Sequence, residues 1–316
     1  MRKRVSIVTP CYNEEANVGP LHLAVKTVMA TLSYDYEHLF IDNDSRDTTQ
    51  SVLTEIAKQD PNVRVIFNAR NFGHIRSPYY GILQASGDAV ITLVADFQDP
   101  PEMIPELLKA WDQGSKVVVC VKRKSKENPL MFFLRKVYYR LMSRTSSIDH
   151  IENFTGFGLY DRKFVEVLRQ IDDPYPYFRG IVAEYAFQKK VIEYTQPQRL
   201  HGKTKNNFYS LFDIALLGMV NHTKIPLRLL TLSGLVLSLV TFFLGVFYLV
   251  QKLIYWDTLQ MGVAPMLIGI FFLGSVQMLF MGIIGEYIGA IYTQVKKRPR
   301  VVEKERLNFE NDKNGN

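Results

Sequence analysis

The sequence predicts an α/β fold with a mostly parallel sheet, followed by interfacial helices and a two-helix transmembrane hairpin. Short β-rich runs alternate with helical stretches over residues 1–125, and two long uncharged runs follow near the C-terminus. The chain of 316 residues is 47% hydrophobic and 22% charged and contains two cysteines, which excludes a disordered chain, a collagen-like fibre and a disulfide scaffold. Its length is sufficient for two domains.

Residues 1–125 alternate between the two kinds of element. The expected strands are Val5–Thr9, His38–Asp42, Val63–Asn68, Ala89–Leu93 and Lys116–Val121. The expected helices are Glu14–Leu32, Thr48–Lys58, Ser77–Ala85 and Glu102–Trp111. Apolar strands separated by helices indicate βαβ units with right-handed crossovers, and ligands of such sheets bind beyond the carboxyl ends of the strands. Neither G-x-G-x-x-G after the first strand nor a P-loop occurs, which disfavours a dinucleotide dehydrogenase and a P-loop NTPase.

Acidic groups follow the first, second and fourth strands. They lie in the segments Pro10–Glu15, Asp42–Asp47 and Asp96–Glu102. Carboxylates gathered at one sheet edge repel one another unless a cation or ligand donors offset them, and a hard divalent ion holding a diphosphate would do so. Asp and Asn after strands also cap helices, which is the favoured interpretation of Asp47, whereas Asp42 and Asp96 at strand ends favour function.

Two uncharged runs, residues 229–251 and 258–285, are long enough to cross a bilayer. The link between them is short, so they predict a hairpin, with transmembrane helices at about 229–251 and 260–285. Lys and Arg flank the hairpin on its outer ends and are sparse in the link. The positive-inside rule therefore places the N-terminal domain and both termini in the cytoplasm.

The strand-end segments carry a resemblance to a known family. Val8–Glu15, Asp42–Thr48 and Asp96–Glu102, taken in this order with the two spans, resemble a family 2 inverting glycosyltransferase of the GT-A (Rossmann-like) fold. The type that is most similar is the bacterial polyprenyl-phosphate (bactoprenol) glucosyltransferase, related to dolichyl-phosphate mannose synthase. The resemblance runs from the first strand to the end of the second span.

The resemblance implies roles for individual residues. Asp96 would be the metal-binding acid and Gln98 a second metal ligand or sugar contact, with Mg²⁺ or Mn²⁺ as cofactor. The residues expected to bind the nucleotide sugar are Pro10, Tyr12, Glu14, Asp42, Asn43, Arg70, Asn71 and Lys122. For Lys122, which matches a basic position near the donor phosphates, an ordinary surface lysine is the alternative.

Three positions depart from the family pattern. Val94 replaces the first acid of the D-x-D element, and Asn43 replaces the usual second acid after the second expected strand. Gly156 stands where relatives commonly carry an Asp, so no catalytic base carries over. A lipid phosphate is largely dianionic at neutral pH and can attack without losing a proton, so a base is dispensable. Asp161 is a weak base candidate that is better interpreted as an exposed charge at a helix start.

Two basic segments complete the expected site. Residues 198–205 resemble the family loop R-x-x-G-x-[ST]-K, in which Arg199 and Lys205 would be catalytic by screening the leaving phosphates, with Lys203 beside the lipid phosphate. A solvated basic stretch next to the membrane is the alternative. Residues 129–144 have apolar residues at helical spacing with Arg135, Lys136 and Arg140 interspersed, which is typical of an interfacial helix. An amphipathic helix packed on the sheet is the alternative, and a nucleic-acid surface is disfavoured near lipid headgroups.

These expectations divide the chain into four parts: a cytoplasmic GT-A domain (residues 1–205), a juxtamembrane interfacial helix (206–226), two transmembrane helices (227–292) and a cytoplasmic basic tail (293–316). The expected function is transfer of a hexose, glucose from UDP-glucose foremost, to polyprenyl phosphate with inversion, at the inner face of a bacterial-type cell membrane. A mannosyl- or other hexosyltransferase with a different donor, and a non-catalytic tethered sugar-nucleotide binder, are the alternatives. A processive polysaccharide synthase is disfavoured because two spans offer no channel and Q-x-x-R-W is absent. Gly285-x-x-x-Gly289 leaves a homo-oligomer open.

Overall fold

Four parallel strands form the centre of the sheet. They are β1 (Arg4–Cys11), β2 (Asp35–Asp42), β3 (Val63–Asn68) and β4 (Ala89–Thr92). β1 pairs with β2 on one side, where Val5 lies opposite Tyr36, and with β4 on the other, where Val5 lies opposite Ala89. These strands are buried on both faces, as is typical of a parallel sheet covered by helices. The computed structural model describes residues 2–123, 151–199, 225–255 and 263–309.

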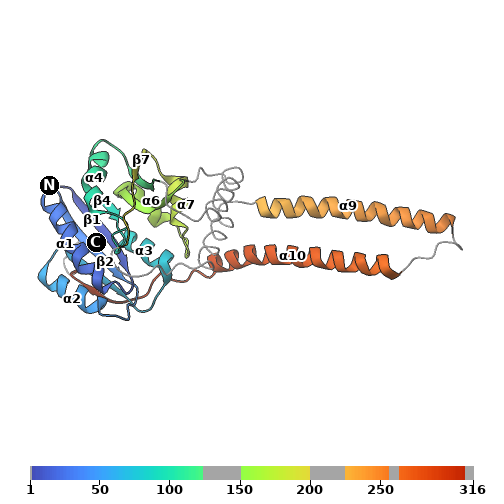
Figure 1. Ribbon diagram of the computed structural model, residues 1–316, viewed down its shortest axis with the longest axis horizontal. Helices are drawn as coiled ribbons and strands as arrows, with labels where there is room; N and C mark the ends of the chain where they lie inside the picture. The colour runs from blue at the N-terminus through green and yellow to red at the C-terminus, as the bar shows by residue number, and fades with distance from the viewer. Residues whose placement is uncertain (1, 124–150, 200–224, 256–262, 310–316) are drawn as a thin grey trace.

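Four further strands extend this centre on both sides. They are β5 (Val117–Lys122), β6 (Phe154–Asp161), β7 (Lys189–Tyr194) and β8 (Glu303–Leu307). Within the described residues the order is β7-β5-β6-β4-β1-β2-β3-β8, with β6 antiparallel to β4 and β5, and β8 antiparallel to β3. β8 follows the second long helix, so the chain returns from that helix to close the sheet edge beside β3 (Figure 1).

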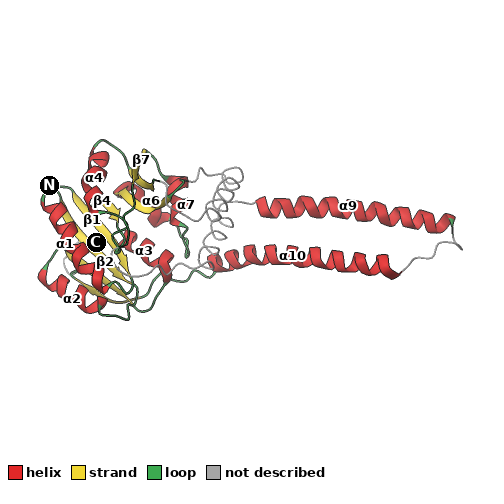
Figure 2. Ribbon diagram, viewed as in Figure 1, coloured by secondary structure: helices red, strands yellow, loops and turns green. Residues whose placement is uncertain are grey.

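Helices cover both faces of the sheet. One face carries α1 (Glu15–Ala30), α2 (Thr49–Gln59) and, after the short helix η1 (Pro101–Met103), α4 (Ile104–Asp112). The other carries α3 (Gly73–Gln84), α6 (Arg162–Gln170) and α7 (Phe178–Tyr185). Figure 2 shows α3 and α7 on the side of the domain that faces the two long helices.

Helix α3 packs unusually close to the sheet because of Gly81. A Cβ on this residue would lie 2.5 Å from Ile41 Cδ1 and 2.8 Å from Val8 Cγ1. A larger residue here would push against the Ile41 and Val8 side chains, so glycine allows α3 to lie close to β1 and β2. The first turn of α3 is thereby held beside the carboxyl ends of these strands.

Two long apolar helices project from the domain and lie side by side (Figure 1). They are α9 (Ile225–Ile254) and α10 (Val263–Val295). The segments Leu229–Phe247 and Phe272–Val295 have mean hydropathies of 2.3 and 1.3 and bury none of their length inside the protein. Length, composition and exposure together suggest membrane association.

The expected α/β fold with a mostly parallel sheet is confirmed. All five expected strands and all four expected helices are present, with ends shifted by a few residues. No strand was expected at β6, β7 or β8, and β8 makes part of the predicted basic tail a member of the sheet. The predicted interfacial helices at 129–144 and 206–226 lie outside the described residues, apart from the start of α9.

Candidate active site

A cavity of about 370 Å³ opens at the carboxyl ends of β1 and β4; we call it the central cavity. Its walls come from these strand ends, the loop after β4, the first turns of α3, the end of β5 and the segment around α7. Its polar lining includes His74, Asp96, Gln98, Asp99, Lys122 and Arg179. The chemistry therefore gathers at the edge where ligands of parallel sheets bind.

Asp96 and Arg199 form an ion pair at this cavity. Arg199 donates to Asp96 Oδ2 from Nε at 2.9 Å and from a terminal nitrogen at 2.5 Å. The Asp96 side chain is 7% exposed and that of Arg199 is 25% exposed, so water screens the pair only partly. The predicted metal-binding acid and the predicted phosphate-binding cation thus lie in direct contact.

The loop after β4 holds these groups in a tight turn. Gln98 donates its backbone N–H to Asp96 Oδ1 at 3.1 Å, and Phe97 between them has a φ of 61°, in the left-handed region. A bulky non-glycine residue with this φ stores strain of about 1–3 kcal/mol. The turn places both predicted metal ligands, Asp96 and Gln98, on the central cavity.

Asp99 is a further acid of the same loop to which the sequence had assigned no role. It accepts hydrogen bonds from the Val94 N–H and the Tyr194 hydroxyl at 3.3 and 3.1 Å. Burial raises the pKa of Asp99 to about 6, because desolvation outweighs these hydrogen bonds. An acid with this pKa changes its protonation state near neutral pH.

Asp42 ends β2 beside Cys11 of β1 and is fully buried. Its Oδ2 accepts from the Ser45 N–H at 3.1 Å and from Gln50 Nε2 at 2.8 Å. Its Oδ1 is buried and has no hydrogen-bond partner in the part of the chain that the structure describes. Desolvation raises the pKa of the carboxyl. A buried acceptor without a partner is costly, and a donor from a ligand that reached it would satisfy it. Asp42 is not among the residues that line the central cavity.

Hydrogen bonds join the loop after β1 to the loop after β2. Ser45 Oγ accepts from the Asn13 N–H at 2.8 Å, and Thr49 Oγ1 accepts from the Glu14 N–H at 2.9 Å. Glu14 also accepts from Asn17 Nδ2 at 2.6 Å. Of the three residues that the sequence predicted here, Pro10 lines the central cavity, whereas Tyr12 and Glu14 belong to the adjoining loop.

Asn43 occupies a structural position between the loops after β2 and β3. Its Oδ1 accepts from Asn68 Nδ2 and the Phe72 N–H at 3.0 and 2.9 Å, and its Nδ2 donates to Asn71 Oδ1 at 2.9 Å. A carboxylate could not make the last bond, which gives a physical reason for an amide where the family usually has an acid. The side chains of Asn43 and Asn71 are therefore engaged with the protein itself.

The structure places two predicted cations, Lys122 and Arg70, in different cavities. Lys122 lines the central cavity at the end of β5, whereas Arg70 lines a separate cavity beside α10. Gly156 has a φ of 110°, and its carbonyl accepts from Thr92 Oγ1 and the Tyr160 hydroxyl at 2.5 and 2.7 Å. This position of the central cavity therefore carries no carboxylate.

Asp161 differs from the expectation of an exposed charge. It is 6% exposed, caps α6 by accepting from the Lys163 N–H at 2.9 Å, and accepts from Trp111 Nε1 at 2.7 Å. These hydrogen bonds hold its pKa below the usual value against the desolvation that would raise it. The helix-start position was predicted correctly, but the exposure was wrong because Trp111 of α4 covers the carboxylate.

The remaining predicted residues cannot be placed. Arg135, Lys136, Arg140, Lys203 and Lys205 lie outside the described residues. Sequence reasoning also missed His74 and Arg179, which line the central cavity from α3 and α7. Neither residue belongs to a sequence motif typical of a functional site, so only the fold shows that they line the central cavity.

Among the described residues no group of three or more His, Cys, Asp or Glu is arranged to hold a metal ion. Mg²⁺ commonly binds through one or two carboxylates together with substrate phosphates rather than through an all-protein cage. The buried carboxylate of Asp96 with the amide of Gln98 on the same cavity fits that kind of donor set.

Comparison with known proteins places the chain in a family. The model of glycosyl transferase family 2 matches residues 6–169. The SfII prophage-derived bactoprenol glucosyl transferase of Shigella flexneri is 32% identical over 95% of this chain and 97% of its own. An uncharacterized glycosyltransferase of Synechocystis is 33% identical over 95% of this chain and 94% of its own. The chain belongs to glycosyl transferase family 2, and its relatives include bactoprenol glucosyl transferases.

Solved structures show more distant likenesses. Glucosyl-3-phosphoglycerate synthase from Mycobacterium tuberculosis, in complex with Mn²⁺, UDP-glucose and phosphoglyceric acid, has a TM-score of 0.49 and 16% identity over 69% of this chain and 78% of its own. Mannosyl-3-phosphoglycerate synthase from Rubrobacter xylanophilus has a TM-score of 0.48 and 17% identity over 73% of this chain and 75% of its own.

Proposed function

We propose that this chain transfers a hexose, glucose from UDP-glucose foremost, to polyprenyl phosphate with inversion at the cytoplasmic face of the membrane. The observation that carries the proposal is the buried Asp96 paired with Arg199 at the carboxyl edge of the sheet, in a domain attached to two long apolar helices. The names of relatives that match nearly the whole chain support a glucosyl group and a bactoprenol acceptor.

The proposed reaction is a single in-line displacement. An oxygen of the lipid phosphate forms a bond to the anomeric carbon, while the bond from that carbon to the donor diphosphate breaks and UDP leaves. The acceptor oxygen is already ionised at neutral pH, so no protein base has to remove a proton. The backbone of Gly156, which offers no carboxylate to the cavity, is consistent with this chemistry.

The task left to the protein is electrostatic and positional. Lys122 brings positive charge to the cavity where the leaving diphosphate would lie, and Arg199 brings positive charge to Asp96 on its wall. A divalent cation, Mg²⁺ or Mn²⁺, held by Asp96 and Gln98 would add charge at the same diphosphate. The unpartnered Oδ1 of Asp42 is the acceptor for a donor of the base or ribose. Pro10 forms part of the cavity wall.

The experiment uses the purified full chain in detergent with Mg²⁺, undecaprenyl phosphate and, in turn, radiolabelled UDP-glucose, UDP-galactose and GDP-mannose. We expect a chloroform-soluble glycolipid with UDP-glucose. If only GDP-mannose gives product, the donor is GDP-mannose rather than UDP-glucose. The absence of product with all three donors, while UDP still binds, would favour a non-catalytic sugar-nucleotide binder and contradict the proposal.

A further inference from the structure

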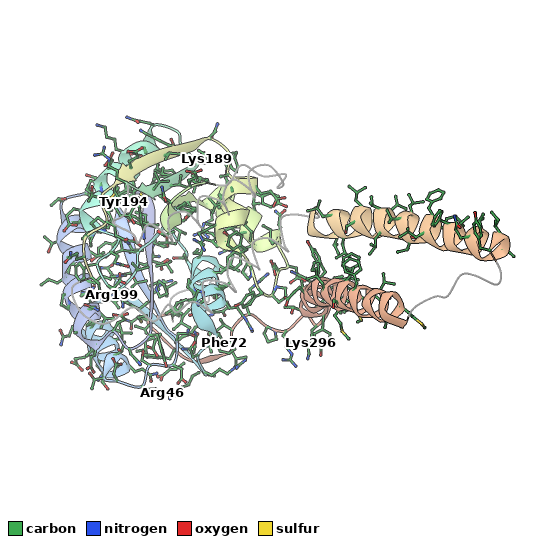
Figure 3. The ribbon with its side chains drawn as sticks, turned by 45° about the vertical axis from the view of Figure 1, so that its right-hand side comes forward. Arg46, Phe72, Lys189, Tyr194, Arg199 and Lys296 are labelled. Carbon is green, nitrogen blue, oxygen red and sulfur yellow. The ribbon has the colours of Figure 1, made fainter. Side chains whose placement is uncertain are left out.

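A second cavity of about 670 Å³ lies where the end of α10 meets the loop between β3 and α3. We call it the junction cavity. Its lining includes Arg70, Phe72, Arg76, Tyr292, Lys296 and Arg298. In Figure 3, Phe72 lies at the edge of the α/β domain nearest to α10, and Lys296 lies at the end of α10 that faces the domain.

The lining of the junction cavity is strongly basic. Among the residues that the structure describes, the lining contains four cationic side chains and no Asp or Glu. Within the part of the chain that the structure describes, neither Arg70, Arg76 nor Arg298 forms an ion pair. The Nε atom of Arg76 is buried and has no hydrogen-bond partner among these described residues. Gathered cations and a buried donor without an acceptor are both costly, and an anion in the cavity would offset both costs.

Aromatic rings hold the cations in place. The Arg70 guanidinium lies 4.7 Å from the Phe72 ring centroid, and the Arg76 guanidinium lies 5.3 Å from that of Tyr175. Lys296 Nζ lies 4.7 Å from the Tyr292 ring centroid and donates to the Tyr292 hydroxyl at 2.8 Å. A guanidinium beside an aromatic ring still presents N–H groups at its edge, and these match the oxygens of a phosphate.

The position of the junction cavity identifies the kind of anion. The candidate membrane span Phe272–Val295 contains Glu286 after its uncharged part and ends immediately before Lys296. The cavity therefore lies beyond the uncharged part of α10, on the side where the headgroups of a bilayer around α10 would lie. Basic pockets at this level attract anionic lipid headgroups. We propose that the junction cavity binds the phosphate of an anionic membrane lipid, and that this lipid connects the α/β domain to the membrane hairpin.

The junction cavity is separate from the central cavity, although α3 borders both. His74, Ile75 and Pro78 line the central cavity, whereas Phe72 and Arg76 line the junction cavity. The proposal concerns lipid binding rather than hexosyl transfer, so it stands or fails independently of the proposed function. Its test therefore measures bound lipid.

The test uses native mass spectrometry of the full chain in detergent with equal amounts of phosphatidylglycerol and phosphatidylcholine. We expect wild type to retain phosphatidylglycerol in preference to phosphatidylcholine. The double variant Arg76→Gln/Arg298→Gln should retain it about 25-fold less tightly, because each basic residue near a lipid surface contributes roughly fivefold. The single variant Arg298→Gln, at an exposed position, should lose about fivefold even if the double variant folds poorly.

The control is Lys189→Gln/Lys190→Gln, which removes the same charge from the exposed strand β7 and should leave lipid retention unchanged. Equal retention by Arg298→Gln and wild type would overturn the proposal. Equal retention of the two lipids by wild type would also overturn it. Inorganic phosphate that displaces phosphatidylglycerol at millimolar concentration would show that the ligand is free phosphate and would overturn the lipid assignment.

Discussion

Arg199 and Asp96, separated by 103 residues, meet as an ion pair in which Arg199 Nε lies 2.9 Å from Asp96 Oδ2. The pair joins the loop after β4 to the segment after β7, and its Asp96 lines the central cavity. The proposed mechanism requires Asp96 to hold a cation and Arg199 to contact the diphosphate. When the ligands bind, the ion pair must therefore break, so that Asp96 contacts the cation and Arg199 contacts the diphosphate.

The first prediction concerns Arg199→Gln. The substitution removes the cation that competes for Asp96, so Mn²⁺ should bind more tightly without nucleotide. It also removes a donor to the leaving diphosphate, and the rate of transfer should fall by about 10²–10³. Electron paramagnetic resonance of free Mn²⁺ and the turnover number measure the two effects. Arg123→Gln, at an exposed pair with Glu193, is the control that should change neither. Weaker Mn²⁺ binding with unchanged turnover would contradict the prediction.

The second prediction concerns Asp42→Asn. In wild type, Asp42 Oδ2 accepts from the Ser45 N–H. In the variant, the amide oxygen should occupy the Oδ2 position and keep this hydrogen bond, so that the amide NH₂ occupies the position of the unpartnered Oδ1. A ligand donor would then face a donor, and the dissociation constant for UDP should rise by about 10–100-fold. Isothermal titration calorimetry measures it. Asp35→Asn, at the exposed start of the same strand, is the matched control. Unchanged UDP affinity in Asp42→Asn would refute the assigned role.

The third prediction concerns Asn43→Asp, which restores the acid usual in the family. The carboxylate still accepts from Asn68 and Phe72 but now faces Asn71 Oδ1 without a donor. The free energy of unfolding should fall by about 1–3 kcal/mol. Thermal unfolding in detergent measures the change, with Asn62→Asp at an exposed position as the control. A variant as stable as wild type would show that the amide donor is dispensable.

The fourth prediction concerns pH and Asp99. Its pKa is about 6 in the folded protein against an ordinary value of 3.8, so between these pH values the folded state binds more protons than the unfolded state. The stability of wild type relative to Asp99→Asn should therefore fall as pH rises from about 4 to 6 and then stay level. The total difference is up to about 3 kcal/mol. Unfolding midpoints measured from pH 4 to 7.5 test this. A relative gain in stability of wild type over that range would contradict it.

The centre of the fold was predictable from sequence because β1 to β4 are apolar and separated by amphipathic helices. The missed strands lack that signal for physical reasons. β6 contains Gly156 and Gly158, which weaken strand propensity, while β7 and β8 are exposed edge strands rich in charge. The pairing of β8 with β3 also joins segments far apart in the chain, which periodicity cannot reveal.

The candidate site was predictable in part. Strand-end position indicated Asp42, Asp96 and Gln98, and the structure places Asp96 and Gln98 on one cavity. The contact between Asp96 and Arg199 depends on how the chain after β7 returns, which spacing does not encode. Arg70, expected near the nucleotide, instead lines the junction cavity, because the loop after β3 turns towards α10.

The measurement that tests the central claim most directly is hexosyl transfer by Asp96→Asn compared with wild type and the control Asp35→Asn. The assay uses UDP-glucose and undecaprenyl phosphate in detergent. Wild type and the control should form a glycolipid with inverted anomeric configuration, and Asp96→Asn should form it at least about 10²-fold more slowly. Equal rates for Asp96→Asn and wild type, with both proteins folded, would contradict the assignment of the central cavity as the site of transfer.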